Sequence, residues 1–221
     1  MNKSTSWKSH KPNAFVGILI INNAPNQPTH DALDDARQDL ENELRNKYSS
    51  LDRKSLRNEP VLAAYDAFYR PFRKTYHIQL QLESIVFKDR SIFSPSTLVT
   101  CMFMAELKTG LLTAGHDYST VEFPLSANLA SGGETYLRLD NTQQELKEGD
   151  LYISDQLGIL SSVIYGPDKR TQIQADTNHI IYTTYGPPGI SKDQICDQLE
   201  ILETYVRLFA PQATREQLSV I

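Results

Sequence analysis

The sequence predicts an α+β fold, and three observations carry that prediction. A strand-like apolar run at residues 15–21 is followed by several segments with helical spacing. Residues 111–185 then change to short apolar runs separated by glycine-containing turns, which is typical of strands. A single capped helix comes last. Because helices and strands are segregated along the chain, we expect an α+β arrangement rather than alternating βα units.

The first two predicted elements are a buried strand and an acidic helix. Residues 15–21 are apolar and rich in β-branched side chains, interrupted only by Gly17. Thr29 or Asp31 is expected to cap the helix, whose apolar positions recur at spacings of three and four: Leu33, Ala36, Leu40 and Leu44. The opposite face carries Asp34, Asp35, Asp39, Glu41 and Glu43. We interpret these acids as a solvent-exposed face and not as a metal site.

Proline and glycine mark the limits of the next helices. Pro60 opens a helix that is expected to end near Arg70, because Pro71 disfavours helical backbone at the residue before it. The segment from Tyr76 fits both strand alternation and helical spacing. A third helix is predicted to begin at Ser94-Pro95 and to stop at Gly110.

The second half of the chain is predicted to hold the strands and one last helix. Turns are expected at Gly132-Gly133, Gly149-Asp150 and Gly166-Pro167. Ser191 and Gln194 then have the spacing of a capping box. The helix that follows is expected to end at Pro211 and to bury Ile195, Leu199, Leu202, Val206 and Phe209.

Composition narrows the class of protein. The chain has 221 residues, 40% hydrophobic and 22% charged, which is ordinary for a globular protein. No apolar run approaches the roughly 20 residues that span a bilayer, and the polar N-terminus lacks a secretory signal. Cys101 and Cys196 form neither a disulfide framework nor a metal-ligand spacing, so we expect buried free thiols. These features favour a cytoplasmic location without membrane contact.

Charge and motif spacing limit the partners and cofactors. A net charge of −5 argues against tight nonspecific binding to a polyanion, so no DNA partner is expected. Any RNA contact would need a local basic patch and would be weak or selective. The histidines His10, His30, His77 and His179 have no metal-ligand spacing, and Gly132-Gly133 is not followed by a helix that could hold phosphate. No metal and no cofactor are predicted.

Several segments, taken in order, resemble a known family. They are residues 64–70 (AYDAFYR), 112–118 (LTAGHDY), 133–139 (GETYLRL) and 146–155 (LKEGDLYISD), the last followed by Gly158. Together they are similar to the B3/B4 module of the phenylalanyl-tRNA synthetase β subunit and to its standalone members. The resemblance covers residues 55–190. It suggests three parts, an N-terminal strand and helix at 1–54, a B3/B4 core at 55–190 and a C-terminal helix at 191–221.

The resemblance implies a fold and a function. It implies a three-layer β/β/α arrangement with an unusual β-sandwich. In the synthetases this module contacts tRNA and hydrolyses mischarged tyrosyl-tRNA. The parts that charge tRNA have no counterpart in these segments, so the chain is not expected to be an aminoacylating synthetase. The substrate site is expected where residues 113–117 and 166–171 converge to form one hollow.

The residues of that site are carried over position by position and depart from the synthetase pattern. The synthetase histidine aligns with Ala114, while His116 lies two positions later, on the same face if this segment is a strand. His116 is therefore the candidate catalytic residue, with structural hydrogen bonding as the alternative. The pocket glutamate of the synthetases aligns with Lys169, which donates hydrogen bonds but cannot accept them. The remaining pocket candidates are Glu83, Gly115, Asp117 and Thr171, although Glu83 and Asp117 also fit structural ion pairs.

An RNA-binding surface is the last candidate feature. Tyr65 and Tyr69 lie near Arg70, Arg73 and Lys74, a mixture that suits base stacking and phosphate contact. Lys169 and Arg170 would add positive charge at a loop. The alternative is that the aromatic residues form a buried stripe. Two functions stay open at this point: an aminoacyl-tRNA deacylase acting in trans, or a noncatalytic relative that binds RNA, a small molecule or a protein.

Overall fold

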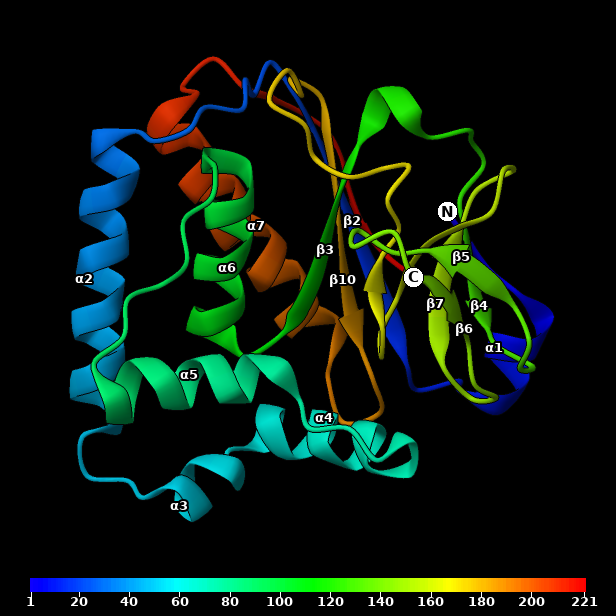
Figure 1. Ribbon diagram of the computed structural model, residues 1–221, viewed down its shortest axis with the longest axis horizontal. Helices are drawn as coiled ribbons and strands as arrows, with labels where there is room; N and C mark the ends of the chain where they lie inside the picture. Colours follow the sequence, from blue (N-terminus) through cyan, green and yellow to red (C-terminus); the bar gives the residue numbers. More distant parts are fainter.

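The computed structural model describes residues 1–221 and confirms the α+β class. Figure 1 shows three layers: helices, a four-stranded sheet and a second sheet of five strands. This is the β/β/α order that the family resemblance implied. One continuous cluster of 51 buried apolar residues runs from Trp7 to Ala213, so both ends of the chain share one core.

The helices occupy the first half of the chain and one segment near its end. The α-helices are α1 (Thr5–His10), α2 (Asp31–Tyr48), α3 (Arg53–Arg57), α4 (Pro60–Tyr69), α5 (His77–Lys88), α6 (Thr97–Thr109) and α7 (Lys192–Phe209). Two short 3₁₀ helices are η1 (Arg70–Phe72) and η2 (Tyr118–Thr120). None of the helices is both long enough and apolar enough to cross a membrane.

The four-stranded sheet carries the strand from which the site is built. Its order is β11 (Thr214–Val220), β2 (Phe15–Asn22), β10 (Ile180–Gly186) and β3 (Leu112–Asp117), and every pair is antiparallel. Helices α6 and α7 cover one face of this sheet (Figure 1). The contact is close at Gly17, where an added Cβ would lie 2.4 Å from Cγ2 of Ile195. Glycine is therefore required where α7 crosses β2.

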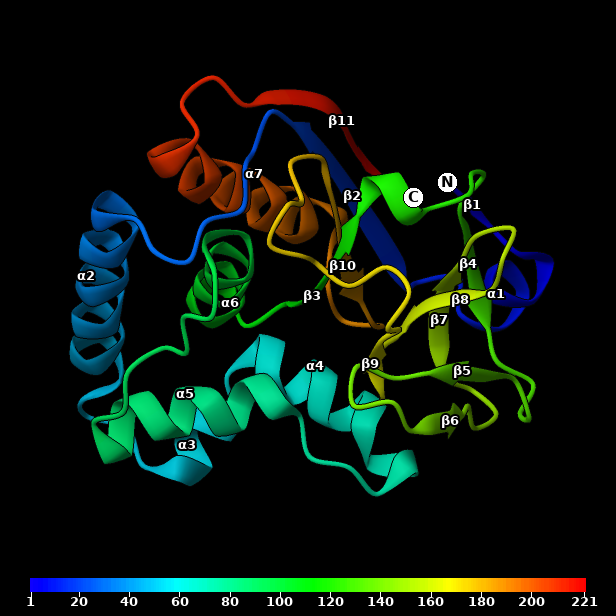
Figure 2. The same cartoon turned by 45° about the horizontal axis from the view of Figure 1, so that its top comes forward.

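The second sheet lies on the other side and is less regular (Figure 2). Its order is β1 (Asn2–Lys3), β4 (Ser126–Leu129), β7 (Leu151–Ser154), β8 (Ile159–Ser162) and β9 (Gly166–Pro167). Only the β1–β4 pair is parallel. A separate hairpin, β5 (Thr135–Leu137) and β6 (Gln143–Glu145), adjoins it. The predicted Gly166-Pro167 turn is wrong, since these residues pair with β8.

Helix limits agree with the sequence where backbone chemistry sets them. Pro60 opens α4, Gly110 ends α6 with φ of +82°, and the Ser191–Gln194 capping box is present. The ambiguous segment after Tyr76 is helix α5. Two predicted helix starts are wrong. The N-cap of α2 is His30, without a side-chain hydrogen bond, and not Thr29 or Asp31, while α6 begins at Thr97 and not at Ser94-Pro95.

Three further differences concern burial and the end of the chain. Glu41 was expected on an exposed face, but it is buried and pairs with Arg37 and Arg45. Cys101 is buried as predicted, whereas Cys196 is only half-buried. No sequence pattern indicated strand β11, which follows α7 and pairs with β2.

Candidate binding cavity and its polar neighbours

A cavity of about 380 Å³ lies where the helical layer meets both sheets. Helix α6, strand β3 and the segment between β8 and β9 supply most of its wall, and we call it the central cavity. Its wall residues are His77, Val99, Met102, Phe103, Glu106, Leu112, Thr113, Ala114, Gly115, Leu139, Ser162, Val163, Ile164, Tyr165, Gly166, Pro167, Gln172, Ile173 and Tyr185. A mostly apolar pocket of this size with few polar groups is typical of a small-ligand site.

The two segments expected to converge do meet at the central cavity. Thr113, Ala114 and Gly115 form one part of the wall, and Gly166 and Pro167 form another. The other candidates in these segments, His116, Asp117, Lys169 and Thr171, are not wall residues.

Gly115 keeps the cavity open at its β3 side. A Cβ added there would lie 2.8 Å from Cδ1 of Ile173, which is too close for a side-chain carbon. Any larger residue would therefore push Ile173, itself a wall residue, out of its place.

Glu106 is the acidic residue of the cavity wall, although the predicted site did not include it. It lies in the last turn of α6 and is 1% exposed. Its Oε1 accepts a hydrogen bond of 2.8 Å from the backbone N–H of Thr113, and Oε2 has no partner in the protein. Burial raises the pKa of Glu106 to about 8, against the opposing effect of the Thr113 hydrogen bond.

One signal in the sequence marks Glu106. It falls four residues after Met102 and eight after Leu98, so it continues the apolar stripe of the helix. A charged residue in such a stripe either pairs internally or faces a cavity. Glu106 falls in a helix predicted from the sequence but was not among the predicted site residues.

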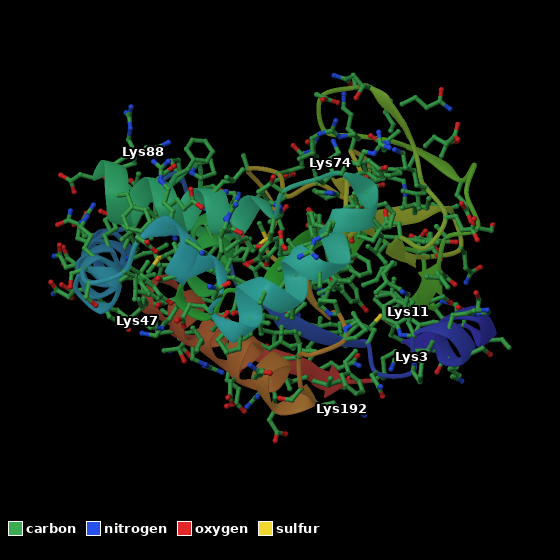
Figure 3. The ribbon with its side chains drawn as sticks, turned by 90° about the horizontal axis from the view of Figure 1, so that it is seen from below. Lys3, Lys11, Lys47, Lys74, Lys88 and Lys192 are labelled. Atoms are coloured by element: carbon green, nitrogen blue, oxygen red, sulfur yellow. The ribbon has the colours of Figure 1, made fainter.

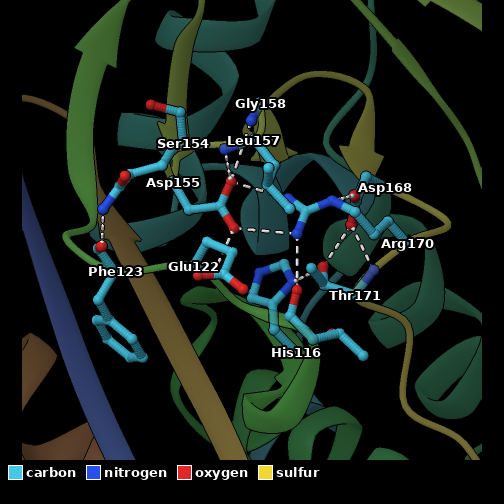
Figure 4. A network of polar contacts seen from close by, with 12 residues as sticks. His116, Glu122, Phe123, Ser154, Asp155, Leu157, Gly158, Asp168, Arg170 and Thr171 are labelled. Carbon is cyan, nitrogen blue, oxygen red and sulfur yellow. Dashed lines mark hydrogen bonds and ion pairs between the residues drawn. The ribbon is translucent and has the colours of Figure 1, made fainter.

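His116 lies in a buried polar network outside the cavity (Figure 4). Its Nδ1 is 2.8 Å from Oγ1 of Thr171 and its Nε2 is 3.2 Å from Oγ of Ser161. The Thr171 hydroxyl donates to Asp168, so it must accept from Nδ1–H of His116. Nε2 then accepts from Ser161, whose oxygen accepts from the hydroxyl of Tyr185.

His116 is uncharged at neutral pH because it is buried. Burial, reinforced by the positive charge of Arg170, lowers the pKa of His116 to about 3. Both ring nitrogens are already hydrogen-bonded and neither faces the cavity. The geometry therefore corresponds to the structural alternative for His116 rather than to the catalytic one.

Arg170 is committed to the same network and does not present a free charge. It makes two hydrogen bonds to Asp155, of 3.0 and 2.9 Å, and one of 2.7 Å to the carbonyl of Thr120. Burial raises the pKa of Asp155, but the Glu122 N–H and Arg170 outweigh it and hold that pKa below its ordinary value. Lys169 is half-buried, donates to Asn141 and lines a separate surface hollow with Arg170.

The two acidic candidates also have structural partners. Glu83 lies on α5, accepts from Gln79 at 2.8 Å and is within 4.0 Å of Arg53 and Arg57. Asp117 caps η2 and accepts from Ser119 and Thr177. Neither is a wall residue of the central cavity.

Part of the predicted RNA-binding surface lies next to the cavity. Lys74 is exposed, and its Nζ lies 5.8 Å from the ring centre of Tyr165, a wall residue. Arg73 is exposed beside it, and Arg70 pairs with Asp66 at 2.7 Å. Figure 3 shows Lys74 far from Lys88 and Lys47.

The aromatic residues of this region form core, so the stacking interpretation is wrong for them. Tyr65 and Tyr69 are 0% and 2% exposed. The Tyr69 hydroxyl donates to the carbonyl of Val163 at 2.6 Å, and the Tyr65 hydroxyl accepts from the N–H of Leu112 at 2.9 Å. They hold α4 against the sheets and leave no ring for a base.

The class of protein follows from comparison with known families. The family model described as B3/4 domain matches residues 83–201, more than half of the chain. This stretch contains Glu106, strand β3 and the β8–β9 segment, and thus most of the cavity wall. The chain belongs to the B3/4 domain family.

The similar proteins are synthetase subunits. The phenylalanine–tRNA ligase beta subunit of Mycoplasma pneumoniae is 34% identical over 79 residues, 36% of this chain and 10% of that protein. The corresponding subunit of Mycoplasma genitalium is 31% identical over 67 residues, 30% of this chain and 8% of that protein. The chain thus matches only about a tenth of either relative.

A solved structure gives a further alignment. It is an N-terminal fragment of the phenylalanyl-tRNA synthetase beta subunit from Pyrococcus horikoshii, aligned over 99% of this chain and 49% of that chain with a TM-score of 0.47 and 11% identity.

Proposed function

We propose that this chain binds aminoacyl-tRNA, takes the aminoacyl end into the central cavity and hydrolyses the ester of a misacylated tRNA. The observation that carries the proposal is the position of the cavity. Most of its wall lies inside the B3/4 match, including β3 and the β8–β9 segment. The relatives named above are subunits of a tRNA ligase. Ester hydrolysis in such a site needs a positioned water and hydrogen-bond donors for the oxyanion.

The exposed bases beside the cavity support the RNA part of the proposal. Arg73 and Lys74 have no acidic partner, and Lys74 stands over Tyr165 on the cavity wall. A tRNA whose 3′ end enters the cavity would bring its last phosphates near these two side chains. With a net charge of −5, such a local contact is also the kind of RNA binding that the chain can sustain.

A noncatalytic binding protein is the second candidate, and one observation favours it. His116, the side chain expected to act on the ester, is buried, neutral and outside the cavity. Glu106 is then the only acidic side chain in the wall. The cavity would bind the aminoacyl end, or another small molecule, without turnover.

The deciding experiment is a panel of correctly and wrongly charged tRNAs incubated with the protein. Under the proposal, the ester half-life of at least one misacylated tRNA shortens, and every bound tRNA dissociates more readily as salt is raised. Binding without any change in ester half-life supports the second candidate. Absence of tRNA binding at low salt contradicts the proposal and leaves, of the second candidate, only the binding of another small molecule.

The basic side chains give the matched control. Replacing Arg73 and Lys74 by alanine should make the salt dependence of binding shallower, by about one unit of slope for each phosphate that these side chains neutralise. Lys88→Ala removes another exposed lysine, at the far end of α5, and should leave affinity unchanged (Figure 3). Equal effects of the two sets of changes would show that binding is not local to the cavity.

A further inference from the structure

Glu106 differs from every other buried acid of the protein. The others each have an arginine within 4.0 Å or at least two hydrogen bonds. They are Glu41 (Arg37), Glu203 (Arg207 and Arg215), Asp168 (Arg170), Asp117 (Ser119 and Thr177) and Asp150 (Ser162 and Ile164). Glu106 accepts a single hydrogen bond, from Thr113, and forms no ion pair.

The titratable groups around Glu106 do not supply a positive charge. From α4 and the start of α5, the buried hydroxyls of Tyr65, Tyr69 and Tyr76 are close enough for a negative charge on Glu106 to raise their pKa values. His77 shares the cavity wall, but it forms no ion pair with Glu106, and desolvation lowers its pKa. The carboxylate therefore has no cation to balance it.

The position of Glu106 in its helix makes this isolation more costly. It lies in the last turn of α6, where the exposed carbonyl groups give the helix a partial negative charge. An unpaired buried carboxylate is expensive in any surroundings, and here the helix adds repulsion. The fold itself gains nothing from the charge, so a ligand is the natural source of a cationic partner.

The rest of the cavity wall defines the remainder of that ligand. Most of the wall is apolar, and its side chains include Val99, Met102, Phe103, Ile164 and Ile173. Its volume of about 380 Å³ is at the small end of the range for ligand pockets, which suits one amino-acid side chain with part of a ribose. The occupant is therefore a small molecule with an apolar body and one cationic donor.

We infer that Glu106 is a specificity-determining residue that binds the α-ammonium group of the aminoacyl moiety in the central cavity. The inference rests on the proposed function for the identity of the ligand. One ammonium N–H meets the free Oε2, while the Thr113 N–H continues to hold Oε1. The apolar wall receives the amino-acid side chain, so the cavity selects large apolar amino acids that carry a free amino group. An N-acylated ligand lacks the charge and is excluded.

The small amine 2-phenylethylamine and its neutral analogue 2-phenylethanol test this without tRNA. Measured by titration calorimetry, the wild-type protein should prefer the amine by about tenfold or more, the usual effect of one charge-assisted hydrogen bond. In Glu106→Gln the preference should disappear. Glutamine keeps an acceptor for the Thr113 N–H, so this variant retains the local fold.

Proton release gives an independent readout. At pH 7 the raised pKa keeps most of the free protein protonated at Glu106, so binding the amine should expel nearly one proton. Titrations in buffers with different ionisation enthalpies measure that proton. No proton should be released when Glu106→Gln binds the amine, or when the wild type binds 2-phenylethanol.

The outcomes separate the inference from the proposed function. Equal affinity for the two probes, or no binding of either, overturns the role of Glu106 even if tRNA binds. Amine selectivity without tRNA binding upholds Glu106 and rejects the tRNA ligand. If Glu106→Gln prefers the amine over the alcohol as strongly as the wild type does, another group binds the ammonium and the inference fails.

Discussion

Two buried polar regions at the ends of strand β3 differ in how completely their hydrogen-bonding groups are paired. At one end of the strand His116 joins a network in which both ring nitrogens, Thr171 and Asp168 are satisfied. At the other end Thr113 contacts Glu106, a buried acid with one hydrogen bond and a cavity beside it. Both regions are equally hidden from solvent. Only the second has unused hydrogen-bonding capacity, and such capacity is what a ligand can use.

The largest expected effect on stability comes from removing contacts in the fully hydrogen-bonded network around His116. Asp155→Ala removes the partner of Arg170 and the acceptor for the N–H groups of Glu122, Leu157 and Gly158. We expect the free energy of unfolding to fall by about 3 kcal/mol, the lower end of the cost of breaking a buried ion pair, because the Arg170 side chain is partly exposed. Urea denaturation measures it. Asp176→Ala, at an exposed position without side-chain hydrogen bonds, should change stability by less than about 0.5 kcal/mol.

The next largest effect is the pH dependence of stability, which differs between the Glu106 region and the His116 region. The ordinary pKa of 4.5 for Glu106 rises to about 8 on folding, so between these values the folded state holds a proton that the unfolded chain has lost. The free energy of unfolding therefore falls as pH rises through this window. Relative to Glu106→Gln, the wild type should lose up to about 1.4 kcal/mol per pH unit. Parallel stability curves for the two proteins would mean that Glu106 is ionised throughout.

His116 should make the free energy of unfolding change with pH in the opposite direction. Its pKa of about 3 in the folded state lies below the ordinary 6.5, so the unfolded chain binds the extra proton between these values. The contribution of His116 is complete above pH 6.5 and is lost as pH falls towards 3. His116→Gln should flatten this acid limb in denaturation curves recorded at successive pH values.

The smallest effect concerns catalysis by the same residue. His116→Gln leaves Thr171 or Ser161 without a partner and should lower stability by about 1–3 kcal/mol. If hydrolysis is observed, its rate in the folded variant should stay within a few-fold of wild type, because the ring does not face the cavity. A loss of two or more orders of magnitude would restore His116 as a catalytic residue.

Local chemistry made much of the fold predictable. Proline before α4, glycine after α6 and the Ser191–Gln194 pair fix helix limits through a few backbone groups, and such limits can be read from short segments. Strand β2 was equally clear, because both of its faces are buried and nearly every side chain is apolar. Strand β11 was missed because it is a polar, half-exposed edge strand with a bulge.

The site was predictable only in part. The order of family segments indicated that residues 113–117 approach residues 166–171, and the cavity lies there. Which side chains enter it depends on strand twist and on partners far away in sequence. His116 is hydrogen-bonded to Ser161 and Thr171, which lie 45 and 55 residues later, and no local sequence pattern predicts those contacts. Glu106 was visible as a charged residue in an apolar stripe, a pattern that needs the cavity to be understood.

The position of β2 between β10 and β11 has a consequence for synthesis on the ribosome. The strand emerges before both of its neighbours, which are residues 180–186 and 214–220. Its apolar side chains therefore stay unpaired while the residues between β2 and these strands are translated. Such long-range pairing is slow to form and exposes nascent chains to aggregation. We expect chaperones at the ribosome to hold this segment until both neighbouring strands have emerged.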